Sequence, residues 1–449
     1  MNQQDGCVAL AERDVAQSLV EIAERHVRDG RLDEAEAMNR EAIAHDPSHH
    51  IAHNNLGNIL RHTGRLPEAL RHFARAFELN PADAVVAHNL AMVLAEQFRF
   101  AEAVPFHRAA AALSPASADV RSALGFSLAQ LAAYDEAELH YREALKIDPL
   151  HFHARINLGL ACVEQGKPAQ ALEQARFLAF AETMVGFPHK AYGILLARAG
   201  RAESARACFE RHLASHPADA DEIAMLLATV GGALPARATN RQIFDLYAMQ
   251  AERWDNGAAG GGGYQGHRLV AAVLAELNAD RVDAAIDAGC GTGLVGELLR
   301  PRIRHLVGVD MSEPMLAQAR QKRIYDSLHC GDLLEFLAAH PQGCDAIVSA
   351  ATLIHFGELA PVFTAVARAL RPQGLFVFTV FPNDDDPSAV AMGTLNGQAQ
   401  GGCFRHGADY ITRTAAACGL AVALDRREVH EYARKAAVPG LVVALRKAA

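Results

Sequence analysis

The chain has 449 residues, of which 51% are hydrophobic and 21% charged, and a formal net charge of −9 at pH 7. This length predicts two or three domains, and the acidic balance without a basic tail argues against nucleic acid as a partner. No apolar run is long enough to span a membrane, and the first residues lack the features of a secretory signal, so we expect a cytoplasmic protein without a membrane partner.

The first half of the chain has a sequence pattern that repeats every 34 residues. A small residue at one position lets two helices pack closely, an aromatic residue fills the space between units, and proline ends the second helix. The pattern resembles the tetratricopeptide repeat and predicts six helix pairs between residues 14 and 217. The recurring residues are alanine, glycine, an aromatic residue and proline: Ala35, Ala69, Ala103, Ala137, Ala171, Ala205; Gly57, Gly125, Gly159, Gly193; Phe73, Tyr141, Phe209; Pro47, Pro81, Pro115, Pro149, Pro217.

This resemblance implies an α-solenoid of tetratricopeptide helix pairs, with a groove that binds a protein or peptide partner. Asparagines on the first helix of such pairs often line the groove, although plain contact with solvent explains them equally well: Asn54, Asn55, Asn89, Asn157. The clustered His49, His50 and His53 have no further Cys or acidic ligand at metal spacing, so we predict no metal site. The eight cysteines form no C-x-x-C pair, and we interpret them as reduced packing residues.

A second domain is expected after a short connector. Residues 218–239 begin as a helix and then become rich in glycine, alanine and proline, which predicts the connector. The second domain then spans residues 240–449, and its first part, residues 240–280, carries the aromatic residues Tyr247 and Tyr264.

The most informative pattern follows that aromatic segment. An apolar run ends in Asp287, a glycine-rich turn and a helix come next, and a second apolar run ends in Asp310. A strand, a tight loop, a helix and a strand tipped with a carboxylate build a nucleoside pocket at the carboxyl edge of a parallel sheet. Glycines let the backbone approach the ligand closely, and Asp310 lies where a carboxylate accepts hydrogen bonds from two ribose hydroxyls. An acid before the first glycine disfavours a pyrophosphate and suits a cationic ligand.

This D-x-G-x-G-x-G pattern with Asp310 behind it resembles motif I of the Rossmann-like S-adenosylmethionine (SAM) methyltransferases. An NAD site or a glycine turn of an unrelated α/β domain is the alternative. Later segments fit the same family: a Gly-Asp turn at Asp332, a strand at 344–349, and an Arg-Pro-Gln-Gly turn before a strand at 375–381. The resemblance implies an α/β Rossmann-like, seven-stranded methyltransferase domain. Its SAM-binding core is expected at residues 281–381, and its acceptor-site insertion and C-terminal strands at 382–449.

The segment at 240–280 resembles the lid of a bacterial group of tetratricopeptide-repeat methyltransferases, in which a first tyrosine covers SAM. Tyr247 matches that tyrosine and Tyr264 a second one, whereas Gly260–Gly263 departs from the pattern. Trp254 takes the place of a phenylalanine of the lid pattern. Packing between modules is the alternative role for Tyr247 and Trp254. The family resemblance implies these cofactor contacts: Asp287, Gly289, Gly291, Gly293, Asp310, Met311, Asp332, Leu333, Ser349, Tyr247 and Tyr264.

The sequence thus predicts an enzyme that transfers a methyl group from SAM to an unidentified acceptor, either a small molecule or a protein, with the repeats recruiting a protein partner. His355 is the candidate general base for an acceptor that carries a proton, and a structural role for this histidine stays equally open. The alternative function is a scaffold that binds SAM without catalysis and acts through its repeats. The intact acids and glycines of motif I favour the enzyme.

Overall fold

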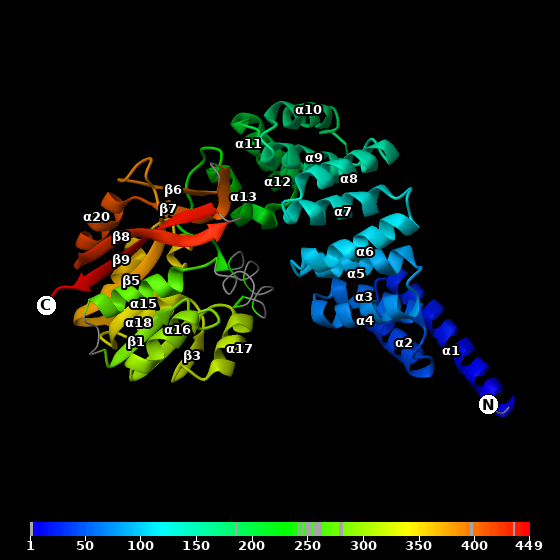
Figure 1. The fold of residues 1–449 in the computed structure, drawn as a ribbon, viewed down its shortest axis with the longest axis horizontal. Helices are drawn as coiled ribbons and strands as arrows, with labels where there is room; N and C mark the ends of the chain where they lie inside the picture. The colour runs from blue at the N-terminus through cyan, green and yellow to red at the C-terminus, as the bar shows by residue number, and fades with distance from the viewer. Residues whose placement is uncertain are drawn as a thin grey trace. The chain divides into compact units, whose positions relative to one another are not determined.

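The computed structural model describes residues 3–184, 186–240, 243, 247, 251, 254, 255, 263–277, 282–395, 398–433 and 436–449, and for residues 3–11, 394, 395, 398–402, 433 and 436 the backbone alone. The chain divides into two compact units, Met1–Gly200 and Arg201–Ala449. In Figure 1 the first unit runs from blue to green, and the second, which contains the sheet, from green to red.

The first unit is built of helices joined by short turns, and each helix packs against the next along the chain. This confirms the α-solenoid predicted from the 34-residue pattern. No helix in the described part of either unit has the length and apolar character that a membrane crossing requires. The helices of the first unit are α1 (Gln3–Arg28), α2 (Leu32–His45), α3 (His50–His62), α4 (Leu66–Leu79), α5 (Ala84–Glu96), α6 (Phe100–Leu113), α7 (Ala118–Gln130), α8 (Tyr134–Ile147), α9 (Phe152–Glu164), α10 (Pro168–Ala179) and α11 (His189–Arg198).

The recurring residues explain how these helices pack. The repeat alanines are fully buried, and Gly57 and Gly125 make room for a ring, since a Cβ at Gly57 would lie 2.7 Å from the side chain of Phe73 and one at Gly125 would lie 2.8 Å from that of Tyr141. In the third repeat Ala91 and His107 occupy these two positions. A larger residue at one position is therefore matched by a smaller ring at the other, which conserves volume in a close-packed interior.

One turn position of the repeat has a left-handed backbone throughout. Four units carry glycine there, where this conformation is free of steric cost, whereas two carry Phe98 and Ala132. The residues are spaced by 34, with φ between +57° and +78°: Gly30, Gly64, Phe98, Ala132, Gly166 and Gly200.

Several polar residues of the repeats have local structural partners. The rings of His49 and His151 each accept a backbone N–H at the start of their own helices, at 3.2 and 3.1 Å. The amides of Asn54 and Asn89 hydrogen bond to each other at 2.9 Å. Across the described part of the chain, no three His, Cys, Asp or Glu side chains gather as the ligands of a metal would.

The second unit begins with helices that precede the sheet. The helix α12 (Ala202–Ser215) is the second helix of the predicted sixth repeat, and it belongs to this unit. After η1 (Pro217–Asp219), α13 (Ala220–Ala228) packs through Met225 and Ala228 against Phe404 of the sheet. The predicted connector therefore starts as a helix with its own apolar contact.

The sheet has the predicted parallel core. The strands run in the order β3-β2-β1-β4-β5, all parallel, and β9 follows antiparallel to β5 and to β8. A hairpin of β6 and β7, within the predicted acceptor-site insertion, extends the end of β5. The strands are β1 (Ala284–Ala288), β2 (His305–Asp310), β3 (Ser327–Cys330), β4 (Cys344–Ser349), β5 (Leu370–Pro382), β6 (Val390–Leu395), β7 (Gln398–His406), β8 (Leu420–Ala433) and β9 (Ala436–Lys447).

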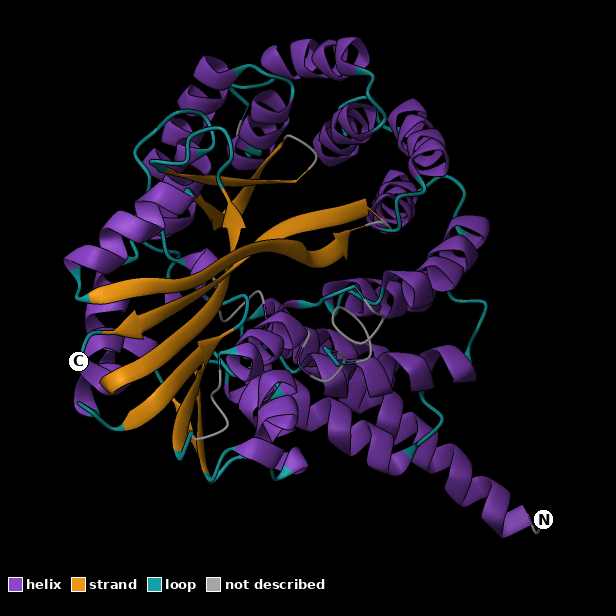
Figure 2. Cartoon of the chain, turned by 60° about the vertical axis from the view of Figure 1, so that its left-hand side comes forward, coloured by secondary structure: helices purple, strands orange, loops and turns teal. Residues whose placement is uncertain are grey.

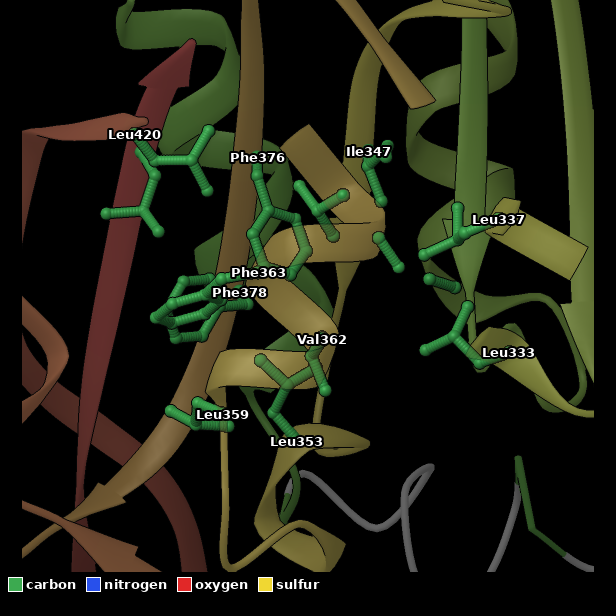
Figure 3. Packing of buried hydrophobic residues seen from close by; sticks show 14 of the residues in the cluster. Leu333, Leu337, Ile347, Leu353, Leu359, Val362, Phe363, Phe376, Phe378 and Leu420 are labelled. Carbon is green, nitrogen blue, oxygen red and sulfur yellow. The ribbon is translucent and has the colours of Figure 1, made fainter. Parts of the chain in front are cut away.

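Helices cover both faces of this sheet (Figure 2). Alternate strand residues point to opposite faces, so Phe376 and Phe378 pack with Phe363 on one face (Figure 3), while Leu375 and Val377 pack on the other. The helices of the second unit that follow α13 are α15 (Gly266–Glu276), α16 (Leu294–Leu299), η4 (Arg300–Arg302), α17 (Glu313–Lys322), α18 (Leu333–Ala339), η5 (Leu353–His355), α19 (Ala360–Ala369) and α20 (Ala408–Ala417).

We predict that a fragment of residues 1–200 folds without the second unit, because the stability of a repeat array is a sum over neighbouring repeats. The fragment should be helical by circular dichroism and should melt cooperatively. A fragment of residues 1–217 is the matched comparison, because it adds α12, whose Cys208 and Phe209 are buried in the full chain. An unfolded or aggregated 1–200 fragment would show that the repeats depend on the second unit.

Candidate active site

A pocket opens at the carboxyl ends of β1, β2, β3 and β4, entirely within the second unit. It holds about 970 Å³ of empty space including its opening to solvent, which is at the upper end for small-molecule sites. The loops that follow these four parallel strands meet there, as is usual for ligand sites of open α/β sheets.

The glycine loop after β1 folds over the end of β2. Gly289 has a φ of +77°, and a Cβ there would lie 2.0 Å from the hydroxyl oxygen of Thr352. A Cβ at Gly291 would instead meet no atom within 4 Å, so its backbone faces open space in the pocket. The loop thus offers bare backbone to a ligand, which supports the predicted role of these glycines.

Asp310, at the end of β2, lines the pocket with its carboxylate already oriented. One oxygen accepts the N–H of Gly291 at 2.9 Å, and the other accepts the N–H of Ser312 at 2.8 Å. Burial raises the pKa of this carboxyl, and the backbone N–H groups oppose that rise. Each carboxylate oxygen has a second lone pair, so both remain able to accept a ligand hydroxyl.

Asp287 lies beneath the loop and does not line the pocket. It is fully buried, one carboxylate oxygen accepts the hydroxyl of Tyr325 at 2.6 Å, and the other has no partner among the described residues. Burial, helped by the nearby charge of Asp310, raises its pKa to about 7 although the hydroxyl of Tyr325 opposes the rise. An unpartnered buried oxygen is costly, and a cationic group or a bridging water would satisfy it. The contact with a cofactor stays a prediction.

Tyr325 was not singled out from the sequence, yet it holds the acid of the motif. Space for its ring comes from two glycines, since a Cβ at Gly296 would lie 2.4 Å from the tyrosine oxygen and one at Gly308 would lie 3.1 Å from its ring. Glycines on α16 and β2 were the available signal, because glycine inside an element often marks a close approach.

Asp332 begins α18 and lines the far side of the pocket. One of its oxygens accepts the N–H groups of Leu334 and Glu335, and the other accepts the guanidinium of Arg237 at 2.9 Å. Burial acts to raise the pKa of Asp332, but the hydrogen bonds and the charge of Arg237 outweigh it and hold the pKa below its usual value. Arg237 belongs to the predicted connector and was not expected in the site.

An aromatic wall closes another side of the pocket and comprises Tyr247, Trp254, Tyr264 and His267. The rings of Tyr247 and Trp254 meet edge to face at 5.4 Å, Trp254 lies 6.5 Å from Tyr264, and Tyr264 stacks on His267 at 5.3 Å. Such faces attract a cation. The structure therefore brings both predicted tyrosines into the pocket, whereas Gly260–Gly262 of the predicted lid lie outside the described residues.

The aromatic wall is attached to the glycine loop through Asp255. This carboxylate accepts the hydroxyl of Thr292 at 2.5 Å and pairs with the ammonium of Lys322 at 2.6 Å. The two contacts connect the segment that carries Trp254 to the loop after β1 and to the end of α17.

His355 ends η5 and lines the same pocket. It is 2% exposed, and its Nε2 shares a hydrogen bond of 2.9 Å with the hydroxyl of Tyr247. Its backbone oxygen accepts the N–H of Ala238 at 2.8 Å. The geometry is compatible both with a group that holds a proton and with a structural support for Tyr247, and the catalytic role stays a prediction.

The remaining predicted contacts are divided between the pocket and the core. Met311 and Leu333 line the pocket, each next to one of its acids. Ser349 does not line it: its hydroxyl donates to the carbonyl of Ala288 at 2.8 Å and is fully buried. Ser349 thus joins β4 to β1 below the site, and its contact with a cofactor stays a prediction.

The fold and this pocket define a Rossmann-like domain whose pocket is lined by a glycine loop and by two oriented acids, Asp310 and Asp332. Residues 286–378 match the family model of the methyltransferase domain, and residues 20–84, 84–114 and 122–179 match models of the tetratricopeptide repeat. The chain therefore joins tetratricopeptide repeats to a domain of the methyltransferase family, which confirms the resemblance drawn from its sequence.

Curated relatives of the second unit are bacterial methyltransferases. Malonyl-[acyl-carrier protein] O-methyltransferase of Yersinia pestis is 28% identical over 40% of this chain and 64% of its own length. Trans-aconitate 2-methyltransferase of Yersinia pestis (strain Pestoides F) is 30% identical over 27% of this chain and 46% of its own. The chain thus spans less than two thirds of either relative. A solved structure of MamA from Desulfovibrio magneticus RS-1 covers 38% of this chain and 98% of its own, at 21% identity and a TM-score of 0.37.

We predict that Asp287 makes the second unit less stable as pH rises. Its folded pKa of about 7 lies above the unfolded value near 3.8, so the folded state retains a proton between these values that the unfolded state has lost. The free energy of unfolding then falls as pH rises from about 4 to about 7. Asp287→Asn should abolish this fall, as measured by denaturant titrations at pH 5 and pH 8.

Asp345→Asn is a control of opposite sign. Burial acts to raise the pKa of Asp345, but two backbone N–H groups and Arg371 outweigh it and hold the pKa below its usual value. This carboxylate stabilises the fold above its unfolded pKa and loses that effect as pH falls through its folded pKa, so its replacement costs more at neutral than at acid pH. Equal pH slopes for Asp287→Asn and the unchanged protein would contradict the assignment.

Proposed function

We propose that this chain binds SAM in the pocket of the second unit and transfers its methyl group to an acceptor. The observation that carries the proposal is Asp310, whose carboxylate is oriented by the N–H groups of Gly291 and Ser312 at the edge of a glycine loop. A ribose with two free hydroxyls matches its two oxygens. The match of residues 286–378 to the methyltransferase domain supports the same cofactor.

The residues around the pocket suit the charges of SAM. Its methionine part carries an ammonium and its sulfur is a sulfonium, so both are cationic. Asp310 supplies a carboxylate in the pocket lining, Asp287 is a second acid below the loop whose ionised form a nearby cation would favour, and the aromatic wall of Tyr247, Trp254, Tyr264 and His267 offers ring faces. The open backbone at Gly291 leaves room for the ligand at the loop. The site therefore fits a cationic nucleoside better than a dinucleotide with its anionic pyrophosphate.

The chemistry asks little of acid or base groups. When bound, SAM supplies an activated methyl group that an acceptor atom displaces in line, so that alignment and the exclusion of water dominate. Asp310 fixes the ribose, and the aromatic wall with Tyr247 covers the ligand. If the acceptor carries a proton, His355 holds it at Nε2, which faces the hydroxyl of Tyr247.

The repeats recruit a protein partner that is the acceptor or carries it. This part of the proposal is supported by the tetratricopeptide repeats of the first unit, which generally present an extended binding surface. A scaffold that binds SAM and methylates nothing is the second candidate. The intact glycine loop with Asp287 and Asp310 favours catalysis, since a degenerate loop would have favoured the scaffold.

We expect SAM to bind with a 1:1 stoichiometry in calorimetry, and Asp310→Ala to weaken binding by about 2 kcal/mol or more, because hydrogen bonds to a charged group contribute about 1.5–3 kcal/mol each. Asp409→Ala, which removes an exposed carboxylate at the start of α20, is the matched control and should bind normally. Unchanged affinity of Asp310→Ala would refute the cofactor assignment.

Trp254 is the only tryptophan of the chain and lies in the pocket lining at 5.4 Å from Tyr247. Its fluorescence should therefore change on addition of SAM or S-adenosylhomocysteine and saturate at the calorimetric affinity. Tyr247→Ala should raise the dissociation constant at least about tenfold, whereas Tyr247→Phe, which keeps the ring, should stay within about threefold. A silent tryptophan with normal affinity of Tyr247→Ala would leave this segment a structural connector.

Transfer is tested by adding the purified protein and SAM labelled with tritium in its methyl group to an extract of the source cells. Label in a protein band identifies a protein acceptor, and label in the organic phase identifies a small molecule. The Asp310→Ala variant is the control and should label neither. Binding of SAM without label in either fraction would favour the scaffold.

A further inference from the structure

The connector before the methyltransferase domain lies along the loop after β4. The N–H of Ala238 donates to the carbonyl of His355 and the N–H of Glu358 donates to the carbonyl of Ala236, both at 2.8 Å. Between them, Arg237 and Phe356 form an antiparallel bridge. The contact is so close that a Cβ at position 357 would lie 2.4 Å from the carbonyl oxygen of Pro235. The backbone of the connector is therefore held by one isolated β-bridge and the two hydrogen bonds that flank it.

This bridge places one charged side chain, that of Arg237, in the lining of the pocket. The guanidinium of Arg237 donates to Asp332 at 2.9 Å and to the amide of Asn240, and its carbon lies 5.5 Å from the centre of the Phe356 ring. The side chains of Arg237 and Asp332 are 29% and 13% exposed. Exposed ion pairs contribute little to stability, but this pair is largely shielded from solvent. Asp332 is also held by two backbone N–H groups, and Arg237 by Asn240 and the β-bridge.

The hydrogen bonds of Asp332 leave one acceptor position for a ligand. Its first oxygen already accepts two backbone N–H groups, from Leu334 and Glu335, and its second accepts Arg237. A carboxylate oxygen has two lone pairs, so the second oxygen can accept one further N–H. A base that presents an amino group can donate this last hydrogen bond to Asp332. A base that presents a carbonyl oxygen places one acceptor against another, and the two repel.

We infer that Arg237 is a specificity-determining positioning residue, which holds the Asp332 carboxylate so that the pocket selects a 6-aminopurine over a 6-oxopurine nucleoside. This inference rests on the proposed function. If Arg237 has this role, the connector is part of the cofactor site, because the orientation of Asp332 depends on a residue that precedes the methyltransferase domain. Without Arg237, the Asp332 carboxylate can turn away from the base. The pocket then discriminates less between the amino group of a 6-aminopurine and the carbonyl oxygen of a 6-oxopurine.

The test compares two ligands that differ at one ring position, S-adenosylhomocysteine and S-inosylhomocysteine, by calorimetry on the full chain. The unchanged protein should bind the adenine compound at least about a hundredfold more tightly. Arg237→Ala should reduce this ratio at least about tenfold, mainly through weaker binding of the adenine compound. Arg237→Lys, which keeps the charge without the planar fork, should give an intermediate ratio.

Arg371→Ala is the matched control, because Arg371 pairs with Asp345 at 2.9 Å, Asp345 also accepts two backbone N–H groups, and neither residue lines the pocket. It should lose stability and keep the ratio of the unchanged protein. A general structural defect would weaken both ligands equally and leave the ratio as it was.

An unchanged ratio in both Arg237→Ala and Arg237→Lys, with both ligands bound, overturns the inference and leaves the proposed function intact. Where Arg237→Ala does not fold, the ratio of Arg237→Lys decides alone, read from Trp254 fluorescence as well as calorimetry. If the unchanged protein binds neither ligand, the proposed function fails and this inference fails with it.

Discussion

The site depends on the fold of one backbone loop over the end of its neighbouring strand. The N–H groups of Gly289 and Cys290 both donate to the carbonyl of Val309, at 2.8 and 3.0 Å, and the N–H of Gly291 donates to Asp310. These bonds fasten the loop after β1 to β2, and they place the carboxylate of Asp310 under the pocket. Side chains larger than hydrogen are excluded at Gly289 by Thr352, so the loop can take this path only with glycine.

The same loop places two acids close together in a buried environment. The pKa of Asp287 is raised first by burial and then by the charge of Asp310, while the hydroxyl of Tyr325 opposes the rise. Such an arrangement reduces stability when no ligand compensates it. Groups with strongly shifted pKa values in a cleft are common at functional sites, and a cationic ligand is the partner that offsets this cost. Two buried acids close to the pocket are therefore consistent with SAM, a cation, as the proposed ligand.

Segments outside the parallel core enclose the pocket. Asp255 connects the aromatic wall to Thr292 of the glycine loop, and the connector reaches the opposite side through Arg237. The strand β8 takes part as well, because Gln265 donates to the carbonyl of His430 and Tyr432 donates to that of Gly263. The core supplies the glycine loop and Asp310, and these outer segments form the remaining walls of the pocket.

Local sequence patterns were sufficient where the physics is local. A 34-residue spacing of alanine, glycine and aromatic residues predicts the solenoid, because each repeat contacts only its neighbours. The acid, the glycines and Asp310 predict the cofactor pocket, because a strand, a loop and a strand that are consecutive in sequence meet at one edge of the sheet.

Only the tertiary structure decided which distant residues meet. Tyr325 reaches Asp287 across 38 positions of sequence, and Arg237 reaches Asp332 across 95. Neither pairing has a local pattern, since both depend on which strands become neighbours. Ser349 lies at the predicted strand end, yet its hydroxyl is buried against Ala288 because side chains alternate between the faces of a strand. The sequence by itself determined the repeats, the loop and its acids, and the packing of the sheet determined what surrounds them.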